Sequence, residues 1–254
     1  MNETAIIAAL SLPSGALVNQ RVPKKLLVEN GAPTAADKRR INEGIEEIHW
    51  LASLKPNTIG VPDYCDDVRE YLEIALLAVT LRQDAKAGRL SELIHRAIPY
   101  PLFLVLSQGD QTTLSLAHKR RAQNEAGKFV LDGDVVEVTV SGNAPLSAEV
   151  NRLFLDAMAL GNQPRANLWL LYQGWIDTLV ALQASQLTGT FTQAATKEAA
   201  IARRGAVQKC RGLELQIASL RNAAEKEKQM ARLVELNLEI KGLEVELAEA
   251  EEKL

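Results

Sequence analysis

The chain has 254 residues, of which 47% are hydrophobic and 24% are charged, and its formal net charge is −3. This length allows one sizeable core with an appendage, or two small domains. The near-neutral charge argues against a protein that coats nucleic acid with its whole surface, and the 4% aromatic content argues against a single-strand binder that stacks bases.

The two cysteines, Cys65 and Cys210, are isolated from each other, and neither has a second Cys or a His at metal-ligand spacing. The sequence therefore predicts reduced thiols and no structural zinc site. The first residues lack the basic start and apolar core of a signal peptide, and no apolar run approaches the ~20 residues that span a bilayer. We expect a cytoplasmic protein with no membrane contact, no metal and no cofactor.

Short elements are predicted in the first 31 residues. Asn2 caps a helix over Glu3–Leu10, and a short strand or an extended connection follows at Ala16–Val18. Pro23 suits the first turn of a brief helix that ends at Gly31.

A longer helix is predicted between Thr34 and Pro56. Thr34 is an N-cap residue with Asp37 three positions later, and five apolar residues follow at helical spacing: Ile41, Ile45, Ile48, Leu51 and Leu54. Pro56 then ends this helix, and Thr58–Val61 predicts a strand.

Strands dominate the region that follows. The stretch Glu70–Leu81 favours a strand, although four apolar residues also fit a helical period: Val68, Leu72, Ala75 and Val79. A helix is predicted over Ala85–Ala97. The next four segments predict strands, and the turn at Gly109-Asp110 joins the first two as a hairpin: Leu102–Leu106, Thr113–Ala117, Phe129–Leu131 and Val135–Val140.

After Gly142 only helices are predicted. Ser147 caps a helix to Leu160, a second runs from Arg165 to about Leu187, and a final helical region begins at about Thr196. The predicted fold class is therefore α+β. An N-terminal mixed α/β-sheet domain covers residues 1–141, a helical connector covers 146–195, and a coiled-coil or helical-hairpin tail covers 196–254.

The tail carries the most informative pattern in the sequence. Between Lys197 and Arg232, nine Lys and Arg stand against four Glu, whereas between Glu235 and Leu254 two stand against seven. Opposite charges at its two ends favour an antiparallel helical neighbour. An uninterrupted helix over residues 197–254 would span about 85 Å, which a small domain cannot bury. We therefore expect the tail to be an interaction device.

The apolar positions of the tail fall into two registers, and within each they keep alternating steps of three and four residues: Leu213, Ile217, Leu220 and Ala224, then Leu233, Leu236, Ile240, Leu243, Leu247, Ala250 and Leu254. The two registers do not join across Glu225–Gln229. The absence of Gly and Pro there fits a stutter in one long helix, whereas the charges fit a pairing of the two halves. We expect an antiparallel arrangement, within one chain or between two chains.

Basic residues flank the predicted hairpin of strands. The start of one strand lies near the end of the other, so five side chains are expected to gather at one edge of the sheet: His95, Arg96, His118, Lys119 and Arg120. Arg and Lys donate charge-assisted hydrogen bonds to phosphate. The cluster predicts either a phosphate or nucleic-acid contact, or a solvated basic rim with two incidental histidines.

A metal-dependent nuclease needs clustered acids and a lysine near a strand end. The candidates are Glu70, Glu73 and Asp84 with Lys119. Because Glu70 and Glu73 are three residues apart, they lie on opposite faces of a strand but on one face of a helix. The strand therefore argues against a shared metal.

Four segments form a recognisable set: 22–27 (VPKKLL), 94–101 (IHRAIPYP), 117–120 (AHKR) and 187–189 (LTG) before the tail. With them, the chain resembles the bacterial family called domain of unknown function 4391 over nearly its whole length. The resemblance implies a role in restriction-like phage-defence loci, where such proteins are often encoded beside helicases and DNA methyltransferases. It supplies no catalytic residues.

We therefore expect a non-enzymatic accessory or assembly subunit of a bacterial restriction-like anti-phage defence system. The tail would bind a protein partner such as a helicase or a methyltransferase, and the basic edge would contact a partner or DNA. One alternative is a metal-dependent DNA nuclease of the same kind of system, which would use Glu70, Glu73 and Lys119. Another is a homodimer with a purely structural role.

Overall fold

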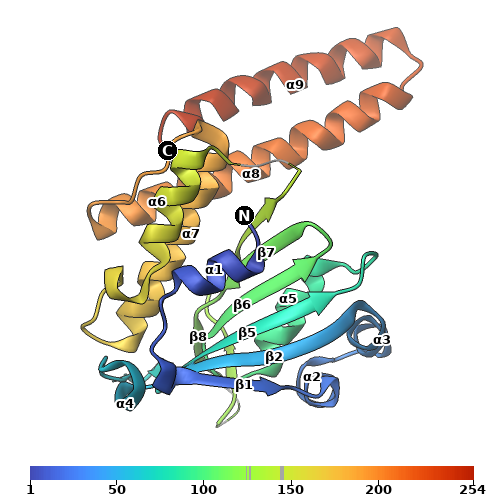
Figure 1. The fold of residues 1–254 in the computed structure, drawn as a ribbon. Helices are drawn as coiled ribbons and strands as arrows, with labels where there is room; N and C mark the ends of the chain where they lie inside the picture. The colour runs from blue at the N-terminus through green and yellow to red at the C-terminus, as the bar shows by residue number, and fades with distance from the viewer. Residues whose placement is uncertain (124, 126, 144–145) are drawn as a thin grey trace. The chain divides into compact units, whose positions relative to one another are not determined.

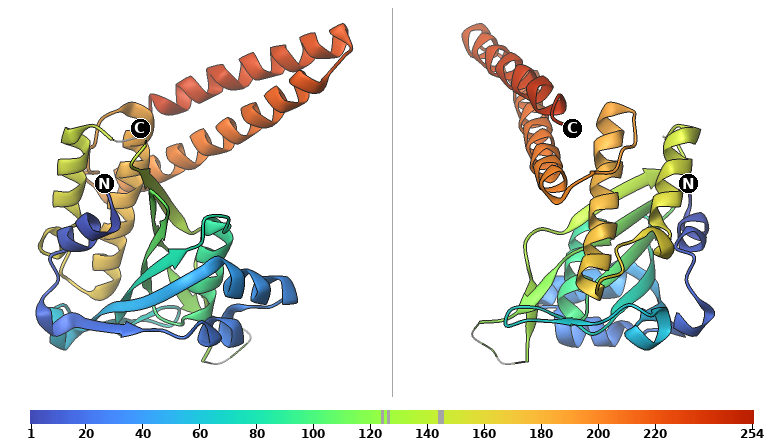
Figure 2. Two further views of the ribbon diagram at one scale, coloured as in Figure 1. Left: turned by 45° about the vertical axis from the view of Figure 1, so that its right-hand side comes forward. Right: turned by 90° about the vertical axis from the view of Figure 1, so that its left-hand side faces the viewer.

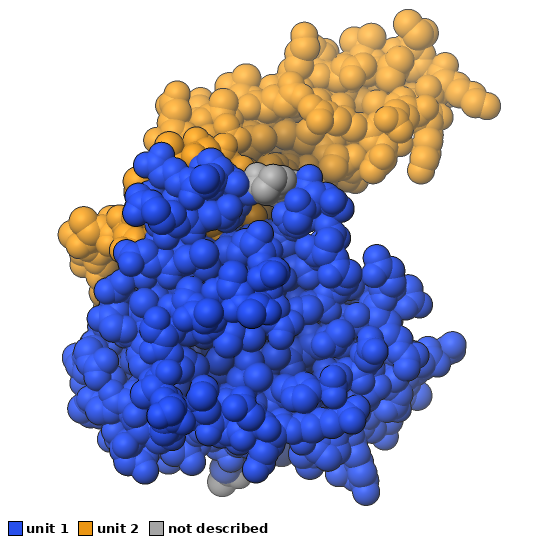
Figure 3. All heavy atoms as spheres, in the orientation of Figure 1, with its two compact units in different colours: residues 1–179 blue, residues 180–254 orange. Residues whose placement is uncertain are grey.

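The structure is a computed structural model that describes residues 1–123, 125, 127–143 and 146–254. It contains two compact units, Met1–Leu179 and Val180–Leu254, which Figure 3 shows in different colours. The predicted α+β class is confirmed, because a six-stranded mixed sheet lies in the N-terminal half and helices make up the C-terminal part (Figure 1). No helix among the described residues is long and apolar enough to cross a membrane.

The sheet has the strand order β1-β2-β5-β6-β7-β10. Its strands are β1 (Leu17–Arg21), β2 (Ile45–Leu54), β5 (Ile74–Leu81), β6 (Leu102–Gln108), β7 (Gln111–Leu116) and β10 (Val136–Ser141). Strands β5 and β6 are parallel and are connected through helix α5 (Ala87–Ala97), while every other neighbouring pair in this sheet is antiparallel. Two small antiparallel pairs accompany it: β3 (Tyr64–Cys65) with β4 (Glu70–Tyr71), and β8 (Lys119–Arg121) with β9 (Phe129–Leu131).

Helices cover both faces of the sheet within the first unit (Figure 2). On one face, α2 (Lys24–Gly31), α3 (Ala35–Gly44) and α5 bury a core with alternate residues of β5 and β6. On the other face lie α1 (Glu3–Ala9), α6 (Ala148–Met158) and the first part of α7 (Leu168–Thr188), where Trp175 packs edge-on against Phe103 of β6. The central strands are therefore buried on both sides.

Burial on both faces explains why the central strands read as continuous apolar runs. The predicted hairpin is confirmed as β6 and β7, and Gly109 supplies the positive φ of its turn. The predicted strand at Glu70–Leu81 is also confirmed, although it is divided into β4 and β5 on either side of Leu72 and Glu73.

The long helix predicted from Thr34 to Pro56 is wrong in its second half. Thr34 caps α3 as expected, since its hydroxyl accepts from the Asp37 amide at 3.1 Å, but the helix ends at Gly44 and β2 begins at Ile45. The pairing of β2 with β5 shifts register between Ile45 and Glu47 and again after Trp50. These irregularities break the two-residue alternation, so the buried residues of this strand imitate helical spacing.

The strand predicted at Thr58–Val61 is also wrong. One turn of helix, α4 (Pro56–Ile59), occupies this place. Pro56 has the fixed φ that suits a first helical position, and the Thr58 hydroxyl accepts from the Lys55 amide at 2.9 Å. Gly60 ends the turn in the left-handed conformation.

The second unit contains a helical hairpin formed by α8 (Lys197–Lys226) and α9 (Met230–Glu251). Thr196 caps α8, and the chain reverses at residues 227–229, where the two sequence registers fail to join. The hairpin form of the predicted tail is thus confirmed. The division between the two compact units falls inside α7. The predicted division into residues 1–141, 146–195 and 196–254 remains a prediction.

Candidate functional site

His95 is buried on α5 behind the sheet. Its Nε2 atom lies 3.0 Å from the Ser115 hydroxyl, which in turn lies 2.7 Å from the hydroxyl of Ser91. Burial, with the nearby Lys119 charge, lowers the pKa of His95 to about 3. This imidazole is therefore neutral at physiological pH and has no surface through which to bind phosphate. Its Nδ1 atom has no hydrogen-bond partner among the described residues.

Lys119 is also buried, with 2% of its surface exposed. Its amine donates to the carbonyl of Ile98, the residue that ends α5, so it occupies a helix C-terminus where a positive charge is favoured. Burial nevertheless lowers the pKa of Lys119 to about 7. The side chain is therefore a structural link between β8 and α5.

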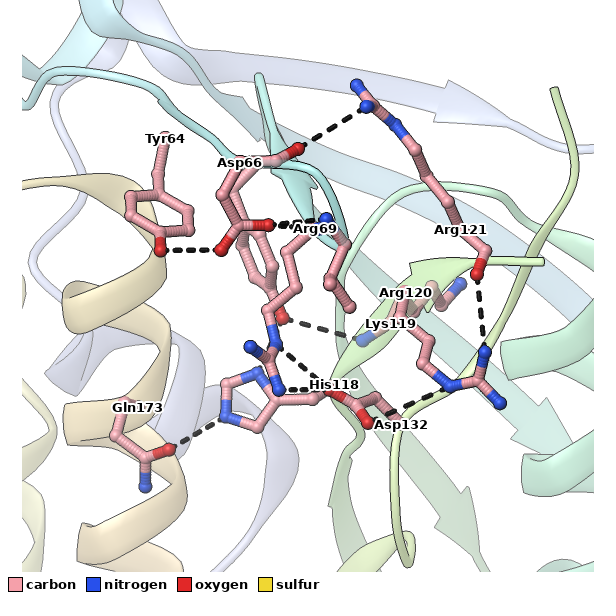
Figure 4. A network of polar contacts seen from close by, with 11 residues as sticks. Tyr64, Asp66, Arg69, His118, Lys119, Arg120, Arg121, Asp132 and Gln173 are labelled. Carbon is pink, nitrogen blue, oxygen red and sulfur yellow. Dashed lines mark hydrogen bonds and ion pairs between the residues drawn. The ribbon is translucent and has the colours of Figure 1, made fainter. Parts of the chain in front are cut away.

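His118 lies immediately before β8, between Tyr71 of β4 and Gln173 of α7, and Figure 4 shows its contact with Gln173. Its Nε2 atom is 2.8 Å from the amide oxygen of Gln173, which can only accept, so Nε2 carries the proton. Nδ1 then accepts from the hydroxyl of Tyr71. Burial raises the pKa of Tyr71, which keeps this hydroxyl protonated and able to donate. In the neutral form of His118, this geometry selects the tautomer that carries its proton on Nε2.

Three arginines at the surface of this region share two carboxylates, and Figure 4 shows two of them, Arg69 and Arg120, at Asp132. Arg69 lies 2.6 Å from Asp132, and Arg120 approaches the same carboxylate at 3.9 Å. Arg121 pairs with Glu70. Most of the positive charge of the rim is therefore balanced by acids within the chain.

Arg96 and Arg120 are the two predicted basic residues that line one hollow. Its volume is about 790 Å³, and it lies between the α2–α3 connection, the end of α5 and the β8–β9 pair. Lys128 also lines it, together with Glu29 and Glu125. Arg96 pairs with Glu92 at 2.7 Å. The structure therefore divides the predicted cluster into a buried part and this partly neutralised hollow.

The three residues of the nuclease hypothesis do not meet. Glu70 pairs with Arg121, whereas Glu73 is buried and accepts from Lys55 at 2.9 Å and from Ser53 at 3.1 Å. Lys119 is held at Ile98. In the part of the chain that the structure describes, no group of three His, Cys, Asp or Glu side chains is placed to hold a metal ion.

The contact between α8 and α9, which we call the seam, is formed by apolar residues of the two registers predicted from the sequence. Leu213 and Ile217 of α8 and Leu236, Ile240 and Ala250 of α9 are buried. Cys210, Leu213 and Ala250 form one cluster, with Leu187, Leu243, Leu247 and Leu254 packed against it. Arg221 of α8 lies 2.7 Å from Glu244 of α9, and this ion pair joins the two helices.

The side of α9 opposite this seam exposes large apolar residues. They are Met230, Val234, Leu238 and Val245, with 73%, 53%, 65% and 61% of their surfaces exposed. Steps of four, four and seven residues place them on one stripe of the helix. We call this stripe the α9 outer face. Sequence analysis missed it, although its spacing is visible, because the seam residues form the stronger pattern.

The model of the family described as domain of unknown function (DUF4391) matches residues 10–247. The chain belongs to this family. No curated protein and no solved structure matches this DUF4391 chain. The match covers the sheet, α7, all of α8 and most of α9, so all but the last turn of the hairpin lies within the family's own boundaries.

Segments 22–27 and 94–101 of this DUF4391 chain meet at one place in the fold. Both contribute to the lining of a cavity of about 430 Å³ beside α2: Val22, Pro23, Leu26 and Leu27 from the first, and Ala97, Ile98, Pro99 and Tyr100 from the second. Lys119, from segment 117–120, holds the Ile98 carbonyl. Sequence analysis missed this convergence because the segments lie more than 60 residues apart along the chain.

Proposed function

We propose that this chain is a non-enzymatic assembly subunit whose working part is the α8–α9 hairpin. The observation that carries the proposal is the α9 outer face, where four large apolar side chains are each more than half exposed. Exposed apolar patches of this kind are characteristic of interaction surfaces. A helix with apolar residues on two opposite sides is stable in water when both sides are covered.

The setting that we propose is a bacterial restriction-like anti-phage defence system, in the cytoplasm. This part of the proposal rests on the resemblance to the DUF4391 family. The protein partner of the tail would then be a helicase or a methyltransferase. The hollow lined by Arg96, Arg120 and Lys128 supports a further contact with DNA, because these side chains can donate to phosphate.

The alternative of a metal-dependent nuclease has less support. Its acids are engaged in separate ion pairs with Arg121 and Lys55, and its lysine is buried. A nuclease of this type needs acidic ligands that share one metal ion. The geometry therefore favours assembly over cleavage.

Substitution of Leu238 by glutamate tests the proposed function. Tagged full-length protein is purified from its native host, and the co-purifying proteins are quantified by mass spectrometry. Leu238→Glu should lower the recovery of specific partners at least tenfold, because a charge on the α9 outer face must be desolvated on binding. Ala218→Glu, an exposed position on the flank of α8, serves as the matched control and should leave recovery unchanged. Equal recovery of all proteins with both variants would contradict the proposal.

A further inference from the structure

The hairpin has a second uncovered side, on α8. Ile201 and Leu215 are 59% and 73% exposed, and both lie opposite the seam. The stripe positions between them are the uncharged Gly205, Gln208 and Gly212, and the next two after Leu215 are the uncharged Ser219 and Asn222; Lys197 and Lys226 stand at its two ends. A Cβ atom added at Gly205 or Gly212 would meet no heavy atom within 4 Å. We call this stripe the α8 outer face.

The two outer faces match in length. Met230 to Val245 covers 15 residue steps on α9, or about 22 Å, and Ile201 to Leu215 covers 14 steps on α8, or about 21 Å. The α9 outer face presents four bulky side chains. The α8 outer face has bulky side chains at its ends and two glycines between them, which leave room for a neighbouring helix to approach closely.

The two helices also match in charge. Helix α8 carries seven Lys and Arg against three Glu, and α9 carries two against six. Across the contact, the glutamates beside the α9 outer face would meet the basic residues beside the α8 outer face. Complementary charges of this kind favour association and select the correct partner.

A contact between two α9 outer faces is unfavourable. The charged residues beside this stripe are glutamates, among them Glu235 and Glu249, and Lys241 is the one basic residue within the stripe. Two copies would place like charges opposite one another, which destabilises helix pairs. The occupant that fits the α9 outer face is therefore a basic helix.

We propose that the α9 outer face binds the α8 outer face of a second copy of this chain. This inference rests on the proposed assembly role of the tail, and it identifies the partner of the α9 outer face as a second copy of the chain. Because the two faces differ and lie on opposite sides of the hairpin, the contact is heterologous. Each copy retains one open face after pairing, so association continues beyond the dimer as concentration rises.

Two single substitutions test this contact. Leu238→Glu disables the α9 outer face and leaves the α8 outer face intact, whereas Leu215→Glu does the reverse. Both side chains are mostly exposed, so the hairpin itself should fold in each variant. The mass of the full chain is measured by sedimentation, over a concentration range that brackets a micromolar dissociation constant. Ala218→Glu again serves as the control.

The natural chain and the control should exceed the mass of a dimer as concentration rises. Association should weaken at least tenfold when salt is raised from about 0.1 M to about 1 M. Each of the two variants alone should be monomeric. An equimolar mixture of the two variants should form a dimer and nothing larger, because the α8 outer face of one variant can still bind the α9 outer face of the other. Misfolded variants could not form this dimer.

Three results would overturn the inference. A natural chain that stays monomeric would exclude a second copy as the occupant of the α9 outer face, and the proposed assembly role would survive this result. A Leu215→Glu variant that still dimerises would show a contact between two α9 helices. A mixture that stays monomeric while the natural chain associates would show that other surfaces carry the association.

Discussion

The natural chain should become more stable between pH 7 and pH 10, and methionine in place of Lys119 should remove most of this rise. Burial lowers the pKa of Lys119 from 10.5 to about 7. Between these two values the unfolded chain binds a proton that the folded chain releases, so the free energy of unfolding increases with pH by about 1.4 kcal/mol per unit. The whole effect is on the order of 3–5 kcal/mol, and it is lost as pH falls toward 7.

The measurement is urea unfolding of both proteins at several pH values within this window. The window ends near pH 10, because burial raises the pKa of Tyr71 and Tyr172 and ionisation of unfolded tyrosine then lowers stability. The advantage of Lys119→Met over the natural chain should be greatest near pH 7 and should shrink toward pH 10. Lys25→Met, at an exposed lysine, should run parallel to the natural chain. Parallel curves for all three proteins would show that Lys119 is not buried.

Replacement of Trp175 by alanine should lower the free energy of unfolding by about 3–5 kcal/mol. Trp175 is among the largest fully buried side chains, and its ring lies 5.2 Å from that of Phe103. Its Nε1 atom donates to the Met158 carbonyl at 2.9 Å, so the substitution also leaves a buried acceptor without its partner. Since a domain of this kind is stable by about 5–15 kcal/mol, the loss is a large share of the total.

Trp169 provides the matched comparison on the same helix. It is only half buried and stacks on Tyr64 at 5.5 Å. Urea unfolding of Trp169→Ala should therefore show a markedly smaller loss than Trp175→Ala. Equal losses would contradict the packing of α7 against β6 described above.

The tail could be predicted from sequence because its information is local. The apolar steps at Leu213–Ala224 and Leu233–Leu254 define the seam within one helix each, and the register break coincides with the turn at residues 227–229. The strand β2 could not be predicted, because its bulges depend on pairing with β5, about 30 residues away. Local spacing of its apolar residues therefore favoured a helix.

The basic cluster at residues 95–120 could not be interpreted from sequence for a related reason. The contacts that bury two of its members come from other elements: His95 lies 3.0 Å from the Ser115 hydroxyl of β7, 20 residues away along the chain. Burial of Lys119 depends on the end of α5, which lies 21 residues earlier. The run of basic residues at 119–121 does not by itself predict which side chain is buried.

Helices α8 and α9 of one chain pair with each other and leave two outer faces free. Spin labels at Lys209→Cys and Glu249→Cys, in a chain with Cys65→Ser and Cys210→Ala, allow their separation to be measured by pulsed electron resonance. Lys209 and Glu249 neighbour Cys210 and Ala250, which share one cluster. The hairpin predicts a separation of roughly 20–30 Å, since paired helix axes lie about 8–10 Å apart. Dilution with unlabelled chain should leave this distance unchanged. A separation near 60 Å, the length of 40 residues in one straight helix, would contradict the hairpin, as would a short distance that disappears on dilution.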